Sequence, residues 1–163
     1  AWDFLFEAAG PGSTYVFSPK AHEALVQVLE GLDYSEIGVH DWYVYALARS
    51  IGLTWVIGEE PTLEYRQHGG NVQGANSGSG ARDARMAKLR NGFYRNQFIL
   101  TARTAQKVGT FDDRRARQLC AILRELEGQG VASRLCFALR WRQIRRDRME
   151  GLKLAAARVL GVW

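Results

Sequence analysis

The stretch "GVHDWYVYALARSIG", residues 38–52, predicts the helix from which the rest of the fold can be placed. Its apolar face is formed by residues at helical spacing, namely Trp42, Tyr45, Leu47, Ala48 and Ile51. Asp41 lies at or near the first turn, and Gly52 is a helix stop signal. We therefore expect a helix that begins near Asp41 and stops at Gly52.

Before this helix, the sequence predicts a short strand and another helix. "GPGSTYVFS", residues 10–18, opens with turn residues and continues as a buried-strand pattern over residues 14–17. Ser18 is a good N-cap and Pro19 a good first helical residue. "KAHEALVQVLEGL", residues 20–32, follows with an apolar stripe, and Gly31 marks its end.

After the central helix, "LTWVIG", residues 53–58, predicts a second buried strand. Beyond residue 80 the pattern is helical throughout, first with a stripe formed by Met86, Leu89, Phe93 and Leu100. "FDDRRARQLCAILRELEGQG", residues 111–130, has acids at its start and glycines at its stop, and residues 131–163 form one or two further helices. Two short strands cannot form a stable sheet alone, so we expect their partner strands to lie outside this chain.

The composition is that of a globular protein with a single core, since 47% of the 163 residues are hydrophobic and 24% are charged. No apolar run approaches the roughly 20 residues that cross a bilayer. Cys120 and Cys136 have neither a CxxC spacing nor a nearby histidine pattern. We interpret them as two buried thiols in a reducing cytoplasm.

Charge divides the sequence into two parts. Residues 1–80 carry three basic and ten acidic residues, a net charge of −7, whereas residues 81–163 carry 19 basic and seven acidic residues, a net charge of +12. "GANSGSG", residues 74–80, joins the two parts and has the composition of a flexible loop. This division predicts two different tasks, one for residues 1–80 and one for a basic helical extension at 81–163.

Asp41 is the first candidate for chemistry, because the common nucleotide, zinc-protease and hydrolase motifs are absent from the sequence. A carboxylate at a helix start usually caps the helix, and from sequence alone we favour that interpretation by roughly two to one. The functional alternative is a general base between His40 and Trp42, whose rings would stack on a sugar face.

The second candidate is the loop "YRQHGGN", residues 65–71. Arg66 can form paired hydrogen bonds to phosphate oxygens, and the neutral imidazole of His68 can bind a divalent metal. Gln67 and Asn71 add polar groups on the same loop. A solvated loop is the ordinary alternative, but this concentration of polar side chains favours a ligand contact.

Taken in order, three stretches resemble the C-terminal half of family 2 glycosyltransferases, and most closely the bacterial rhamnosyltransferase-like enzymes of polysaccharide synthesis. They are "EAAGPGSTYVFS", "HDWYVYALARSIG" and "EEPTLEYRQHGGNVQGAN". The match runs from about Phe6 to Asn76, whereas the helices after residue 80 match only in general character. The ordered set is more specific than any of the motifs alone.

The resemblance implies a GT-A fold of the α/β class, mostly helical in this chain, with two or three short strands and a helical C-terminal extension. It also implies an inverting hexosyl transfer from a nucleotide sugar to an acceptor hydroxyl of a glycan or lipid-linked acceptor. Asp41 would be the catalytic base, and residues 1–80 the acceptor side of the catalytic domain. Gly12, Ser13 and Thr14 would border the acceptor, with His40, Trp42, Arg66, Gln67 and Asn71 binding substrate and His68 next to the metal.

One departure from the family is large, because the nucleotide-binding half and its Asp-x-Asp metal motif are absent from the sequence. We therefore expect a divalent metal, Mn or Mg, to be bound mostly by the missing half. We also expect the isolated 163 residues to have no transferase activity. The sequence leaves the donor sugar, the acceptor and the oligomeric state open.

Residues 140–163 combine seven basic and two acidic residues with interleaved apolar side chains. A basic amphipathic helix of this kind predicts binding to an anionic membrane, at the inner face of the cell membrane for a cytoplasmic enzyme. A helix packed on its own domain is equally compatible with the pattern. The rival functions are a basic nucleic-acid-binding module and a non-catalytic interaction domain, and we expect no nucleic acid because the acidic part would repel it.

Overall fold

The computed structural model describes residues 1–58, 60 and 79–163, with side chains from residue 83 onward in the last range. Within these ranges the chain forms seven α-helices and two short 3₁₀ turns, η1 (Asp3–Leu5) and η2 (Gly12–Thr14). The helices are α1 (Pro19–Glu30), α2 (His40–Ser50), α3 (Ser79–Arg90), α4 (Phe93–Val108), α5 (Asp113–Glu127), α6 (Val131–Ala138) and α7 (Arg148–Val159). The described part is therefore all-helical.

Several helix ends lie where the sequence predicted them. The Ser18 hydroxyl accepts a hydrogen bond from the Ala21 amide at the start of α1. Asp112 does the same for the Arg115 amide at the start of α5. Gly52 follows α2 with φ of +85°, a left-handed conformation that glycine adopts without strain, and the Leu53 amide donates back to the Ala48 carbonyl.

The predicted strands are absent, and the expected α/β class is not observed in the described residues. Residues 12–14 form a 3₁₀ turn, Tyr15 is extended, and residues 53–58 have no regular secondary structure. Tyr15, Phe17 and Trp55 pack their rings together, so the two segments meet through side chains. Neither forms a backbone ladder among the described residues, because a strand requires a hydrogen-bonding partner that local sequence cannot supply.

Phe98 on α4 is the centre of the hydrophobic core. Its ring centroid lies 5.0 Å from that of Phe6, 5.3 Å from that of Trp42 and 5.3 Å from that of Trp163. These partners come from the N-terminal segment, from α2 and from the C-terminal end. One core therefore includes residues from both sides of the charge division near residue 80.

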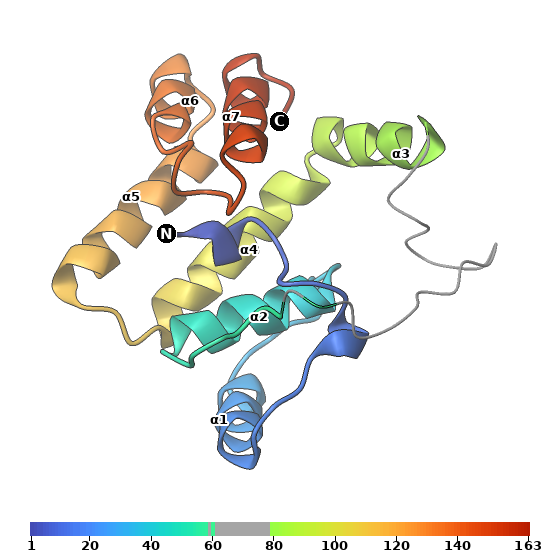
Figure 1. Cartoon of the computed structure of the whole chain (residues 1–163). Coiled ribbons are helices and arrows are strands. Elements are labelled where there is room, and N and C mark those ends of the chain that lie inside the picture. Colours follow the sequence, from blue (N-terminus) through green and yellow to red (C-terminus); the bar gives the residue numbers. More distant parts are fainter. Residues whose placement is uncertain (59, 61–78) are drawn as a thin grey trace.

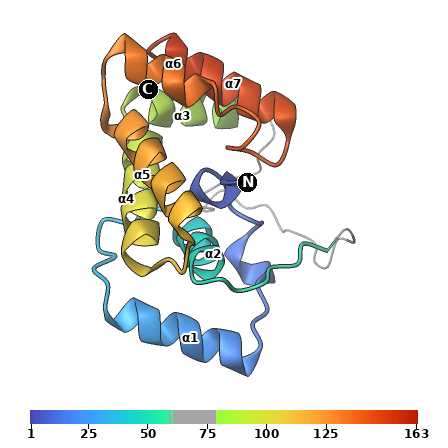
Figure 2. The same ribbon diagram turned by 90° about the vertical axis from the view of Figure 1, so that its left-hand side faces the viewer.

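Figure 1 shows α4 passing through the middle of the molecule, with α2 crossing it and α5 beside it. Helices α6 and α7 lie together at one end of the molecule, and α1 lies at the opposite end (Figure 2). A smaller apolar cluster joins α1 to α2 through Leu25, Tyr43 and Leu47. The predicted stripe on residues 86–100 is interrupted, because Asn91 and Gly92 separate α3 from α4 and Gly92 has φ of +79°.

Two further sequence expectations need correction. Cys136 is exposed and Cys120 is only partly buried, so the expectation of two buried thiols is wrong, and both cysteines are free. No helix in the described part of the chain is both long and apolar enough to span a bilayer. Most of the predicted 74–80 loop lies outside the described residues, and residues 79 and 80 already belong to α3.

Candidate functional site

The turn η2 packs directly against the start of α2. The turn is closed by hydrogen bonds from the Thr14 hydroxyl to the Pro11 carbonyl, 2.7 Å, and from the Tyr15 amide to the Gly12 carbonyl, 3.1 Å. A Cβ atom on Gly12 would lie 3.0 Å from the Cβ of Asp41 and 3.6 Å from the Nε2 of His40. The absence of a side chain at Gly12 therefore allows this close approach.

Five of the predicted site residues are thus brought together, although 28 positions separate Gly12 from the start of α2 at His40 in the sequence. They are Gly12, Ser13, Thr14, His40 and Asp41. Ser13 and His40 are exposed, while Thr14 and Asp41 are partly buried. The arrangement places a carboxylate at the edge of a polar, accessible surface.

One oxygen of the Asp41 carboxylate supports the helix start. Oδ1 accepts a hydrogen bond of 2.8 Å from the Trp42 amide, while the N-cap residue Val39 makes no side-chain cap. The capping interpretation therefore holds for this oxygen, although Asp41 lies inside the helix and not at the N-cap position. Oδ2 accepts no hydrogen bond from a described residue.

The charge of Asp41 affects Tyr15. Burial raises the pKa of the Tyr15 phenol above its ordinary value, and the negative charge of Asp41 is the second cause. The phenol donates a hydrogen bond of 3.0 Å to the Gly10 carbonyl, which fixes the ring beside the turn.

Four aromatic side chains form a cluster next to this turn. The Trp55 ring centroid lies 4.7 Å from that of Tyr15, 5.7 Å from that of Phe17 and 5.0 Å from that of Tyr45. Sequence reasoning did not assign Tyr15 or Trp55 to the site. The available signal was the presence of aromatic residues in segments 14–17 and 53–58, which we interpreted as strands.

Trp42 has a different position from the one expected. Its side chain is buried, the indole N–H donates a hydrogen bond of 2.9 Å to the Phe4 carbonyl, and its ring packs on Phe98. The structure places Trp42 in the core, where it anchors α2 and has no ring face free for a sugar. Its contribution to the site is to hold the neighbouring Asp41 in position.

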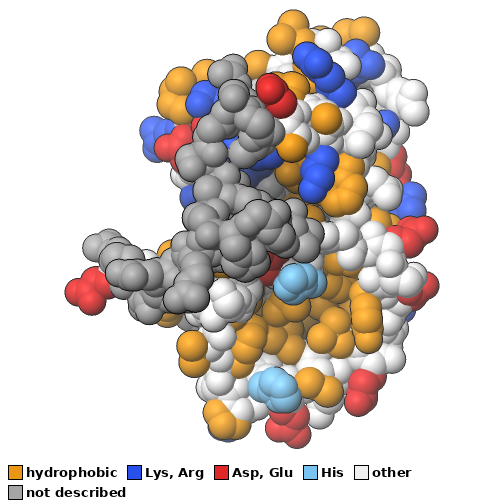
Figure 3. All heavy atoms as spheres, turned by 90° about the vertical axis from the view of Figure 1, so that its right-hand side faces the viewer, with side chains coloured by type: hydrophobic (Ala, Val, Ile, Leu, Met, Phe, Trp, Pro, Cys, Tyr) orange, Lys and Arg blue, Asp and Glu red, His pale blue; other side chains and the backbone are white. Residues whose placement is uncertain are grey.

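The other predicted site residues, Arg66, Gln67, His68 and Asn71, lie outside the described residues. Among residues 1–58, 60 and 83–163, no three histidine, cysteine or acidic side chains converge as metal ligands. Figure 3 shows the face that carries the two described histidines, with hydrophobic side chains gathered between them.

Comparison with known proteins identifies one informative relative. The dTDP-rhamnosyl transferase RfbG of Shigella flexneri is 29% identical over 167 residues, which cover 99% of this chain and 53% of the relative. No family model matches the chain, and no solved structure matches it. The chain spans about half the length of the curated relative that it matches. The predicted resemblance to bacterial rhamnosyltransferases is therefore confirmed, along almost the whole chain, by a curated rhamnosyl transferase.

Proposed function

We propose that this chain is the acceptor-side part of an inverting family 2 glycosyltransferase with a GT-A fold. The complete enzyme transfers a hexose, with rhamnose as the first candidate, from a nucleotide sugar to a hydroxyl group of a growing bacterial polysaccharide. The observation that carries the proposal is the similarity of 99% of the chain to a dTDP-rhamnosyl transferase. The position of Asp41 against Gly12 supports it, because the motif residues meet on one accessible surface.

Asp41 is the proposed general base. Oδ2 removes the proton from the acceptor hydroxyl while the hydroxyl oxygen forms a bond to the anomeric carbon of the donor. The bond from that carbon to the diphosphate breaks, and the nucleoside diphosphate leaves with the bonding electrons. A single displacement of this kind inverts the anomeric centre. The hydrogen bond from the Trp42 amide to Oδ1 keeps the carboxylate oriented throughout.

The neighbouring residues are proposed to bind the acceptor. His40 and Ser13 present polar groups at the surface beside Asp41, and the Gly12–Thr14 turn forms one wall. Trp55 and Tyr15 provide partly exposed aromatic surface for the apolar face of a sugar ring. Trp42 acts from the core as a positioning residue.

The leaving diphosphate is proposed to be met by the loop of residues 65–71. Arg66 would pair with phosphate oxygens, His68 would be a metal ligand, and Gln67 and Asn71 would add hydrogen bonds. A bound divalent metal would neutralise charge on the diphosphate. We assign most of the metal's ligands to the part of the enzyme that this chain does not span.

The proposal is tested in the complete enzyme by replacing Asp41 with Asn. We expect kcat for sugar transfer to fall by about 10²-fold or more, which is the usual contribution of general base catalysis, with little change in the thermal midpoint. Asp113→Asn is the matched control, because Asp113 is also an acid in the first turn of a helix but belongs to α5. Unchanged transfer by Asp41→Asn would assign the site to binding without catalysis.

The cellular location is part of the same proposal. The enzyme is proposed to act in the cytoplasm on a nucleotide-sugar donor. A lipid-linked acceptor would bring it to the inner face of the cell membrane. The basic C-terminal residues 140–163 were predicted to provide this attachment. Salt-sensitive binding to DNA or RNA, without protection by a nucleoside diphosphate and manganese, would favour the rival nucleic-acid-binding function instead.

A further inference from the structure

The outer side of α6 is apolar along its whole length. Val131, Leu135 and Leu139 follow one another at four-residue spacing and are 70%, 50% and 82% exposed. Cys136 is exposed on the same helix, whereas Phe137 is completely buried on the opposite side. A helix on the surface of a water-soluble protein normally has charged residues on its outer side, so this exposed apolar face is unusual.

Helix α7 packs against α6 and also exposes apolar side chains, beside an exposed ion pair between Glu150 and Lys153. Its exposed members are Met149 at 59%, Leu152 at 43%, Val159 at 40% and Leu160 at 79%. We call the exposed residues of the two helices the α6–α7 surface. It comprises Val131, Leu135, Leu139, Met149, Leu152, Val159 and Leu160. These seven are more than half of the 12 exposed large hydrophobic side chains in the described part of the chain. Helices α6 and α7 lie together at one end of the molecule (Figure 2).

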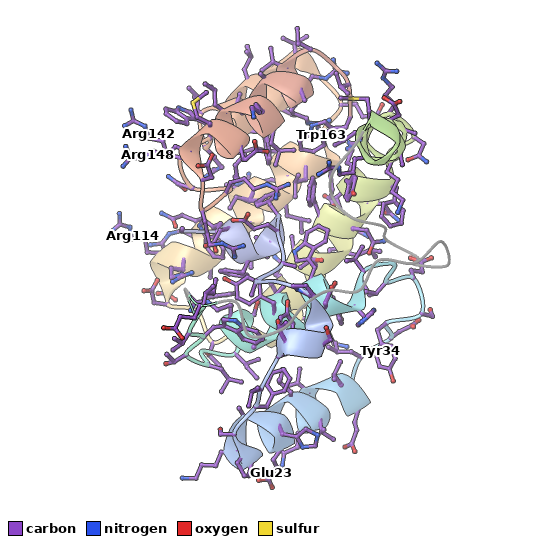
Figure 4. All side chains as sticks on the ribbon, turned by 45° about the vertical axis from the view of Figure 1, so that its right-hand side comes forward. Glu23, Tyr34, Arg114, Arg142, Arg148 and Trp163 are labelled. Carbon is purple, nitrogen blue, oxygen red and sulfur yellow. The ribbon has the colours of Figure 1, made fainter. Side chains whose placement is uncertain are left out.

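Two arginines border the α6–α7 surface where α6 ends and α7 begins. Arg142 and Arg148 are exposed and make no ion pair with a described residue. The Arg142 guanidinium lies 4.7 Å from the centre of the Trp141 ring. Figure 4 shows both arginines pointing away from the protein, with Arg114 of α5 projecting on the same side.

The remaining basic side chains of the C-terminal region are mostly engaged within the protein. Arg140 forms a paired ion contact with Glu125, and Arg145 and Arg146 bind Glu7. Arg158 is buried. Ile144 and Trp163, two apolar residues of the segment 140–163 that was predicted to bind a membrane, are buried in the core. The binding surface therefore differs from the one predicted for residues 140–163.

We propose that the α6–α7 surface binds anionic phospholipid, with its aliphatic side chains in the headgroup and acyl boundary and Arg142 and Arg148 on lipid phosphates. This inference rests on the membrane location proposed for the enzyme but not on its chemistry. Exposed aliphatic groups bordered by free arginines combine the two attractions that hold interfacial helices on anionic membranes. The arginines can contact phosphate while Leu139 and Met149, close to them in sequence, enter the bilayer boundary.

Charge argues against two other occupants of the α6–α7 surface. A symmetric contact with a second copy would bring this region, with eight basic and two acidic residues between 129 and 163, against its own like charge. A nucleic acid would leave the seven aliphatic side chains exposed, because its recognition uses phosphate contacts and ring stacking. An anionic bilayer satisfies both the charge and the apolar surface.

The test is co-sedimentation of the whole chain with vesicles of phosphatidylcholine alone or of equal parts phosphatidylcholine and phosphatidylglycerol. We expect binding only to the anionic vesicles. Leu139→Ser with Leu160→Ser is expected to weaken binding by at least about tenfold, through lost apolar contact. Arg142→Glu with Arg148→Glu is expected to weaken it by about 30-fold or more.

Two control variants make the same kinds of substitution outside the α6–α7 surface. Val16→Ser with Val56→Ser removes two exposed aliphatic groups, 94% and 83% exposed, far along the sequence from α6 and α7. Lys20→Glu with Arg90→Glu changes the net charge by the same amount as the arginine pair. Equal loss in the controls, or equal binding to both vesicles, would overturn the inference. The inference would also be overturned if the protein did not bind vesicles and light scattering showed it to be a dimer that Leu139→Ser with Leu160→Ser converts to a monomer. That result would assign the surface to self-association.

Discussion

Gly12 and Asp41 lie so close that a single added methyl group would place its carbon 3.0 Å from the Cβ of Asp41. Few real Cβ contacts are this short, and both partners belong to backbone that is held by hydrogen bonds. The turn before α1 and the start of α2 therefore constrain each other. This contact sets the position of the proposed base relative to the wall of its site.

The first prediction concerns this contact. Gly12→Ala in the complete enzyme is expected to displace the turn from Asp41 and lower kcat/KM by about tenfold or more, because small misplacements of catalytic groups have large effects. The free energy of unfolding is expected to fall by about 1–3 kcal/mol through overpacking. Gly10→Ala is the control, since its Cβ would meet only the Thr14 hydroxyl at an ordinary 3.6 Å. Equal effects from both variants would show that the Gly12 contact has no special role.

A second prediction uses the titration of Tyr15. Its pKa is raised by burial and then by the charge of Asp41, so Asp41→Asn should lower the Tyr15 pKa toward the ordinary value without restoring it. Nuclear magnetic resonance of ring-labelled tyrosine would follow this single group. An unchanged Tyr15 pKa in Asp41→Asn would mean that the carboxylate points away from the phenol in solution.

The third prediction is the loss of stability in alkali. Burial raises the pKa of Tyr15, Tyr43, Tyr45 and Tyr94 above the ordinary tyrosine value of 10.0. Above pH 10 the unfolded chain loses these protons before the folded chain does, so the unfolded state binds fewer protons and stability falls as pH rises. Denaturant midpoints measured across this pH range should decrease, and Tyr94→Phe should reduce the slope. A flat profile would contradict the burial of these phenols.

The fourth prediction concerns Arg158, whose side chain is only 1% exposed. Its guanidinium donates to the carbonyls of Trp163, Leu126 and Gly128, and so joins the C-terminal end to the end of α5. Arg158→Met should lower the free energy of unfolding by about 2–4 kcal/mol because buried carbonyls lose their donors.

Arg103→Met is the control for Arg158, because Arg103 pairs with Glu127 at a side-chain exposure of 60% and should contribute about 1 kcal/mol or less. Urea unfolding curves measure both variants. Arg158→Lys should rescue little, since one ammonium group cannot reach several carbonyls as a planar guanidinium does. Full rescue of the free energy of unfolding by lysine would show that Arg158 acts through its positive charge alone.

The fifth prediction separates anchoring from ligand contact at Trp42. Trp42→Phe should destabilise the protein by about 1–3 kcal/mol because the Phe4 carbonyl loses the indole N–H. Trp141→Phe, at a partly exposed ring next to Arg142, should change stability by about 1 kcal/mol or less. Thermal unfolding measures both, and a larger loss for Trp141 would contradict the core position of Trp42.

Helix positions and helix ends were largely predictable from the sequence. Leu119, Ile122, Leu123 and Leu126 recur at helical spacing, and all four are buried in α5. The caps at Ser18 and Asp112 involve groups three residues apart, so local sequence contains both partners of each hydrogen bond. The candidate base Asp41 was found in the same way, from its place at a helix start.

The sequence was a poorer guide where a partner lies far along the chain. The residues 14–17 and 53–58 have strand composition, but no described segment pairs with them and they remain outside any sheet. Trp42 was expected to bind substrate, and Trp163 belongs to the segment 140–163 that was expected to bind a membrane, yet both pack on Phe98. Burial depends on which elements meet, and that information is not local.

By itself, the sequence determined the helices, their caps and the identity of the ordered motif residues, because hydrogen bonds and periodicity within one helix join residues only a few positions apart. Only the tertiary structure decided that Gly12 faces Asp41, that Arg158 closes the end of α5, and that the aliphatic residues of α6 and α7 remain exposed. Each of these depends on the packing of elements that are distant in sequence, where close contact is set by the shape of the whole core and not by any single segment.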